Sequence, residues 1–224
     1  NTQSGTQWDG LRHFPLIEHG IFYNNMRLDA LPHGTVSFQN PHQIDPAHAR
    51  IGIQNWATHG ICGRGMLLDL VSHQTSLATN QALPYDPWSA YAISVPELEA
   101  CAQVQGIKFQ WGDILILCVR FTKKYYEALQ AEREALQGKP ETFAGIKQSE
   151  DMKHFIWDNW HFAATAFDQP ALEAQTLLGF VPFQTWGILE KLSEVCTETG
   201  RYTFFFSFLP LNIIGRCASP PNEA

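Results

Sequence analysis

Four polar residues near the start of the chain have side chains that could take part in chemistry. They are the amides Gln3 and Gln7, the carboxylate Asp9 and the imidazole His13. If this segment is a strand, all four point to the same face, because successive side chains of a strand alternate between its two sides. Asp9 and His13 would then form an acid/base pair, whereas the two amides are poor groups for a reactive site.

Two further candidates lie far downstream. His161 stands between a predicted helix and the apolar segment HFAATAF, where a buried imidazole needs a polar partner. Glu173 follows twelve residues later, beyond that segment and a turn that could bring the chain back. Together with Asp9, these residues would supply two carboxylates and an imidazole, which can hold one divalent ion such as zinc, manganese or iron. Spacing alone does not establish that the three converge.

The chain has no motif typical of nucleotide binding or of a serine or cysteine nucleophile. GRGMLLD resembles only part of a phosphate-binding loop, and it precedes a strand instead of following one. There is no GxSxG motif, and none of the five cysteines has a histidine at an informative spacing. The cysteines also lack CxxC spacing, so we expect reduced thiols in a cytoplasmic protein, with Cys62 and Cys118 buried in apolar segments.

Segments of strand type alternate with segments of helix type after residue 60. Strands are predicted over 63–69, 112–121, 161–167 and 201–208. Helices are predicted over 51–60, 94–106, 123–138, 149–160 and 187–200. The segment 18–49 is rich in Asn, His, Pro and Gly and is expected to be irregular. This alternation favours an α/β fold over an all-β fold, and the lack of a repeat or linker favours one domain over residues 1–224.

The composition is that of a globular protein, with 45% hydrophobic and 17% charged residues. A formal net charge of −7 and 15 thinly scattered basic residues argue against a nucleic-acid or anionic-membrane partner. The most apolar run, YTFFFSFLPLNIIG, is interrupted by Ser207, Pro210 and Asn212, so no membrane span is predicted.

The opening segment NTQSGTQWDGLRHF resembles the HxGTHxDxPxH signature of the putative cyclase family, which includes kynurenine formamidases and isatin hydrolases. Later segments resemble further blocks of that family in the same order: GRGMLLDL, GDILILCVRF, SEDMKHFIWDNWHFAATAFDQPALEA and TETGRYTFFFSFLPLNIIGRCASPPNEA. The chain is most similar to the longer branch found in fungi and some bacteria, in which GTQWD replaces GTHxD. The resemblance implies a swivelling β/β/α fold, with a mixed β-sheet flanked by helices, in one cyclase-like domain that lacks its N-terminal portion. It also implies a homodimer.

The same resemblance implies roles for the site residues. In metal-dependent members, the motif aspartate bridges two ions, and a downstream histidine and glutamate complete the second metal site. In this chain those three ligands fall on Asp9, His161 and Glu173, and the family's acid/base histidine falls on His13. The two upstream histidine ligands are replaced by Gln3 and Gln7, whose amide oxygens bind zinc far more weakly than imidazole does.

These replacements change the metal that we expect. The first family metal position should be empty or weak, which leaves Asp9, His161 and Glu173, together with the carbonyl oxygen of Gln7. This oxygen-rich set shifts the preference from zinc toward manganese or magnesium, or toward no bound metal.

The resemblance implies an arylformamidase-like hydrolase of a small amide, lactam or lactone beside an aromatic ring, as in the kynurenine pathway. A bound divalent ion would polarise the carbonyl and activate water, and His13 would transfer the proton. Trp8, Phe14 and Tyr23 would line an apolar substrate pocket. Two alternatives remain at this point. One is a metal-independent lyase, isomerase or cyclase of secondary metabolism that uses His13 and Asp9, and the other is a binding protein that has lost its chemistry.

Overall fold

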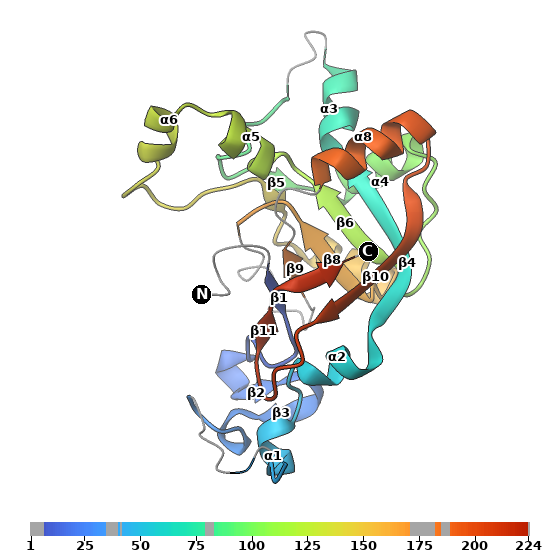
Figure 1. The fold of residues 1–224 in the computed structure, drawn as a ribbon. Helices are drawn as coiled ribbons and strands as arrows, with labels where there is room; N and C mark the ends of the chain where they lie inside the picture. The colour runs from blue at the N-terminus through green and yellow to red at the C-terminus, as the bar shows by residue number, and fades with distance from the viewer. Residues whose placement is uncertain are drawn as a thin grey trace.

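A mixed sheet of eight strands runs through the computed structural model, which describes residues 7–34, 40, 42–78, 83–170, 182–184 and 189–223. The strands lie in the order β11-β1-β9-β8-β6-β4-β10-β12, and Figure 1 labels each of them except β12. Their bounds are β1 Gln7–Asp9, β4 Ile61–Asp69, β6 Ile114–Cys118, β8 Ala164–Phe167, β9 Pro182–Gln184, β10 Thr203–Pro210, β11 Ala218–Ser219 and β12 Pro221–Glu223. The sequence therefore predicted the main strands of this sheet, although it gave no sign of β9, β11 and β12.

The middle of the sheet is parallel and its flanks are antiparallel. β4, β6, β8 and β9 run in the same direction, whereas β10 is antiparallel to β4 and β1 is antiparallel to β9. All five residues of β6 are buried, which agrees with the continuous apolar run from which this strand was predicted. Two small sheets lie outside the main one, β2 Ile21–Phe22 with β3 Met26–Arg27 and β5 Ala92–Ile93 with β7 Gly145–Ile146.

Helices connect the parallel strands, as an α/β fold requires. Their bounds are α1 Pro46–Ala49, α2 Gln54–His59, α3 Leu70–Leu77, α4 Val95–Val104, α5 Phe121–Glu127, α6 Gln130–Glu134, α7 Glu150–Lys153 and α8 Leu189–Thr199. Three 3₁₀ turns, Ile17–His19, Tyr23–Asn25 and Leu28–Ala30, occupy much of the early segment that the sequence marked as irregular. None of the helices in the described ranges is both long and apolar enough to cross a membrane.

Local signals explain where two of these helices begin or end. At the start of α4, Ser94 and Glu97 form a reciprocal capping box, and the Ser94 N–H donates to the Glu97 carboxylate over 2.8 Å. At the end of α2, Gly60 has φ of +69° and its N–H donates to the Trp56 carbonyl, so glycine is the residue best suited to this stop. The sequence predicted the start of α4 from Ser94 before Pro96 and the end of α2 from Gly60.

The helix predicted over 123–138 is interrupted in the structure. Ala128 and Leu129 have extended backbones, which separate α5 from α6. The Leu129 N–H donates to the Glu132 carboxylate over 2.8 Å, and this contact caps a new helix in the middle of the predicted one. The predicted helix over 149–160 is likewise divided, since α7 continues into a π-helix over His154–Asn159.

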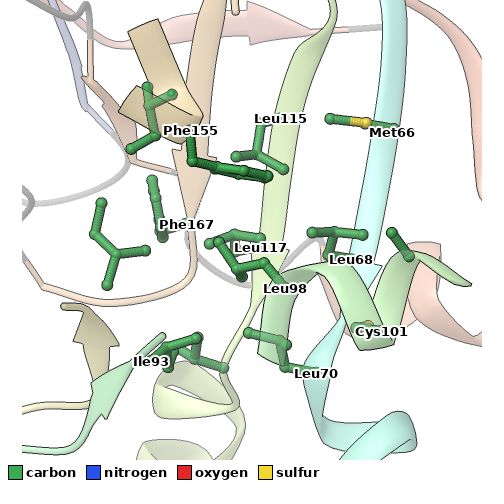
Figure 2. Packing of buried hydrophobic residues seen from close by; sticks show 14 of the residues in the cluster. Met66, Leu68, Leu70, Ile93, Leu98, Cys101, Leu115, Leu117, Phe155 and Phe167 are labelled. Atoms are coloured by element: carbon green, nitrogen blue, oxygen red, sulfur yellow. The ribbon is translucent and has the colours of Figure 1, made fainter. Parts of the chain in front are cut away.

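The two faces of the central strands bury two separate clusters of apolar side chains. On one face, Leu68 and Leu117 pack against Leu98 and Cys101 of α4, as Figure 2 shows. The opposite face buries alternate residues of the same strands against α8, β1 and β10, among them Leu67, Ile116, Leu189, Trp8 and Phe206. This alternation places the core on both sides of the sheet.

The C-terminal segment connects the two ends of the sheet order. β11 pairs with β1 at Asp9 and Ala218, and β12, separated from β11 by Pro220 alone, pairs with β10 at Phe208 and Glu223. Residues 218–223 therefore form both edge strands of the main sheet, β11 beside β1 and β12 beside β10. Ala218, at the start of this segment, lies opposite Asp9.

Candidate functional site

A turn, and not a continuous strand, brings His13 to Asp9. β1 ends at Asp9, and the His13 N–H donates to the Gly10 carbonyl over 2.9 Å to close a tight turn. Gly10 is the first residue of this turn and Leu11 and Arg12 are its central residues. The expectation that residues 3, 7, 9 and 13 share one strand face is thus wrong for His13, and Gln3 lies outside the described residues. Gln7 does lie on β1 with Asp9.

Asp9 and His13 lie within ion-pair distance of each other. Asp9 Oδ1 is 3.4 Å from His13 Nδ1, and the two side chains have exposed fractions of 3% and 22% respectively. A buried carboxylate in this position fixes the orientation of an imidazole and stabilises the charge that the ring acquires when it takes a proton. The pair can therefore act as an acid/base couple.

Cys217 is the third reactive group at this place. The Gly10 N–H donates to the Cys217 carbonyl over 2.7 Å, beside the register pair of Asp9 and Ala218. A Cβ atom on Gly10 would lie only 3.0 Å from that carbonyl oxygen, so this close approach favours glycine. The His13 side chain hydrogen-bonds the Cys217 thiol and lowers the pKa of that thiol below its ordinary value, although burial opposes the shift.

A cavity of about 690 Å³ opens beside Cys217. Its volume is in the range of small-molecule pockets. It is lined by Arg12, Phe22, Leu28, Leu31, Pro32, His33, Gly34, His48 and residues 213–217. Among the three reactive residues, Cys217 is thus the one on the cavity wall.

Hydrogen bonds from neighbouring segments hold the walls of this cavity. The Arg12 guanidinium donates to the His48 carbonyl over 2.9 Å and to the Pro32 carbonyl over 3.3 Å. The Ile53 N–H at the start of α2 donates to the Arg216 carbonyl over 2.9 Å. These contacts fix the loop that carries Cys217 against the segment that precedes α2.

His161 lies in a different environment from the one that a metal ligand needs. Its ring is exposed and stacks on Trp111, with ring centroids 4.3 Å apart, and on Trp157, with centroids 5.5 Å apart. It precedes β8, which is separated from β1 by β9. Two strand spacings amount to about 10 Å, so the sheet holds the backbones of His161 and Asp9 apart.

The described residues do not fit the metal centre that the family resemblance implies. Glu173 lies outside the described residues, and no three His, Cys, Asp or Glu side chains within the described ranges form a group that could hold a metal ion. A zinc ion normally has at least three protein ligands. Asp9, His13 and Cys217 are the groups of this site that can carry chemistry without a metal ion.

The three aromatic residues expected at a substrate pocket have different positions. Trp8 is completely buried, and its ring stacks on Trp56 with centroids 4.8 Å apart, so it belongs to the core. Phe14 and Tyr23 are exposed by 42% and 50%, and neither is among the residues that line the cavity. The aromatic residue on the cavity wall is Phe22, the sequence neighbour of Tyr23.

Sequence reasoning did not find Cys217 as a member of the site. It follows His13 by more than 200 residues, so no local spacing connects them. The segment GRCASPPNEA was part of the family resemblance. The strand predicted over 201–208 was the one sign that this C-terminal segment could lie near the start of the chain. All five cysteines are free, and Cys118 is buried as expected, but Cys62 is exposed and not buried.

Comparison with known proteins finds a family model and solved structures that are similar to this chain. A family model described as "Putative cyclase" matches residues 1–174. No curated protein matches the sequence significantly. The crystal structure of a novel cyclase aligns with a TM-score of 0.76 and 26% sequence identity, over 100% of this chain and 69% of that one.

Two isatin hydrolases align over the full chain at lower identity. Isatin hydrolase A from Ralstonia solanacearum has a TM-score of 0.59 and 12% identity, and 71% of that chain is covered. Isatin hydrolase A from Labrenzia aggregata, bound to benzyl benzoate, has a TM-score of 0.57 and 10% identity, with 72% of that chain covered. Together with the first alignment, they confirm the expected mixed sheet flanked by helices.

Proposed function

The chain belongs to the putative cyclase family, and on that premise we propose that it is a hydrolase that breaks a C–N or C–O bond beside the carbonyl group of a small molecule. The observation that carries the proposal is the contact between His13 and the buried Asp9, next to a cavity of about 690 Å³. Neighbours of this fold that are named isatin hydrolases support the same reaction type.

The substrate that we propose is a small aromatic amide, lactam or lactone, as in an arylformamidase. Phe22, Leu28 and Leu31 give one part of the cavity wall an apolar surface on which a ring can lie. Isatin itself is a lactam fused to an aromatic ring, which makes it a suitable first probe together with an aryl formamide.

The residues present can supply the two proton transfers of such a reaction. His13 takes a proton from the attacking group and later gives it to the leaving nitrogen or oxygen, while Asp9 stabilises the charged ring in between. A divalent ion has no part in this proposal, because His161 is held away from Asp9 and no three-ligand group occurs among the described residues.

The test is the hydrolysis of isatin and an aryl formamide by His13→Asn and Asp9→Asn. Each variant should lose about 100-fold or more in kcat/KM, since general acid/base catalysis typically contributes that much. His59→Asn is the matched control, because His59 is an exposed histidine on α2 and should keep the wild-type rate. Thermal unfolding of each variant checks that the fold is intact.

Rates of His13→Asn equal to wild type would contradict the proposal. Heavy-oxygen water distinguishes the reaction type, because a hydrolase places one water oxygen in the product acid. A product without the heavy oxygen would favour the metal-independent lyase, isomerase or cyclase reaction with the same His13–Asp9 pair. The expected homodimer and the cytoplasmic location stay predictions.

A further inference from the structure

We propose that Cys217 is the nucleophile of this site, with His13 as its general base and Asp9 as the residue that positions His13. The inference rests on the proposed hydrolase function and names the atom that attacks the substrate, Cys217 Sγ. A nucleophile hydrogen-bonded to a base, which is in turn oriented by a carboxylate, is the arrangement that activates cysteine and serine in hydrolases of unrelated folds.

The backbone fixes these three residues next to one another from two distant parts of the chain. Asp9 ends β1 directly opposite Ala218, and the Gly10 N–H donates to the Cys217 carbonyl over 2.7 Å. The turn that begins at Gly10 then brings the His13 side chain to within 3.4 Å of Asp9 and into a hydrogen bond with the Cys217 thiol. Catalytic groups held by sheet pairing keep their geometry better than groups on unpaired loops.

Cys217 is also the exposed cysteine on a cavity wall, whereas Cys118, which lines a smaller cavity of about 120 Å³, is buried. Cys101, Cys118 and Cys196 are buried, and Cys62 is exposed but is not part of the cavity wall. Cys217 combines exposure, a histidine partner and a position on the wall of the cavity of about 690 Å³. Reactive cysteines occur in accessible sites of this kind, whereas buried ones are inert.

The cavity wall also indicates the class of acyl compound. Apolar side chains contribute one part of the wall, and two positively charged residues, Arg12 and Arg216, line the same cavity as Cys217. A substrate with an apolar body and a negatively charged group matches both parts of the wall.

The reaction has two balanced stages. In the first, His13 takes the proton of the Cys217 thiol, the sulfur electron pair bonds to the carbonyl carbon, and the C–N or C–O bond breaks as its nitrogen or oxygen takes the proton from His13. In the second, His13 takes a proton from water, the water oxygen bonds to the carbonyl carbon of the thioester, and the C–S bond breaks. The released sulfur takes back the proton, so the enzyme returns to its starting state.

The experiment uses the full chain and the chromogenic ester p-nitrophenyl acetate as probe. Samples quenched in acid during turnover are examined by intact-mass measurement and peptide mapping. Wild type should carry one acetyl group on Cys217, and its nitrophenol burst should match the enzyme concentration. The charged analogue p-nitrophenyl hemisuccinate should acylate Cys217 faster than the acetate does, and equal rates would overturn the charged-substrate assignment.

Three variants complete the test. Cys217→Ala should lose the acyl group and the burst, whereas Cys62→Ala, which removes the other exposed thiol, should keep both. Cys217→Ser retains the side-chain shape, so a rate loss of about 100-fold or more in this variant cannot be attributed to unfolding. Two results would overturn the assignment of Cys217 as the nucleophile. One is wild type that carries no acetyl group on Cys217, and the other is Cys217→Ala that hydrolyses isatin or the formamide at the wild-type rate. The proposed hydrolase function is tested separately by the His13→Asn variant, so it would survive either of these two results.

Discussion

Asp9, His13 and Cys217 are adjacent because of a few backbone hydrogen bonds at the end of one short strand. The sequence paired Asp9 with His13 on the expectation of a shared strand face, whereas the structure brings them together through the turn from Gly10 to His13. The position of Cys217 was not predicted, because it depends on antiparallel pairing between segments more than 200 residues apart. Local patterns carry no information on such pairing.

Another buried carboxylate, Asp168 after β8, should make the stability of the protein depend on pH. Burial raises the pKa of Asp168 from 3.8 to about 7, although its carboxylate accepts the N–H groups of Val119 and Arg120 over 2.7 and 2.9 Å. Between these two pKa values the folded state holds more protons than the unfolded state, so the free energy of unfolding falls as the pH rises. The expected fall between about pH 4 and pH 7 is on the order of a few kcal/mol.

Urea unfolding of wild type and Asp168→Asn at about pH 5 and pH 8 measures this effect. The neutral amide cannot titrate, so the variant should show a smaller loss of stability with rising pH than wild type does. The same pH dependence in both proteins would show that Asp168 does not keep its proton in the folded state.

At the scale of elements, the close approach of β10 to β4 depends on a glycine. Gly65 lies opposite Phe204, and a Cβ atom there would come within 2.7 Å of the Phe204 ring and 2.9 Å of Phe206 Cβ. Gly65→Ala should therefore lower the free energy of unfolding by about 1–3 kcal/mol, because the aromatic side chains have to shift.

Gly63, two residues earlier on the same strand, is the matched control. A Cβ atom on Gly63 would meet Ile114 Cδ1 at 3.5 Å, which is an ordinary contact. Gly63→Ala should change stability by less than about 1 kcal/mol, as chemical denaturation can show. Equal effects of the two substitutions would mean that the phenylalanines of β10 do not pack tightly on Gly65.

The sequence predicted elements well where their limits depend on local chemistry. The capping pair at Ser94 and the stop at Gly60 are both visible as residue types at fixed spacing. The prediction of one continuous helix over 123–138 was wrong at Ala128. This residue is a good helix former, but its backbone is extended because the Leu129–Glu132 cap starts a new helix. The sequence also failed to predict the two-residue strand β11, since so short a strand exists only through its partner β1.

At the scale of the whole molecule, strand order decides which residues can act together. The resemblance joined Asp9 and His161 in one metal site, but β9 lies between their strands and His161 stacks on Trp111 and Trp157. The C-terminal segment instead brings Cys217 to Asp9 and His13. Nonlocal sheet pairing determines both outcomes, and no spacing in the sequence reveals it.

The central claim is that the reaction takes place at His13 and its two partners and does not depend on a metal ion. The most direct measurement compares the hydrolysis of isatin and an aryl formamide by wild type dialysed against EDTA, untreated wild type and His13→Asn. The account predicts that the dialysed enzyme keeps its rate within about two-fold while His13→Asn loses about 100-fold or more. A dialysed enzyme that is inactive and recovers on addition of manganese or zinc would contradict it.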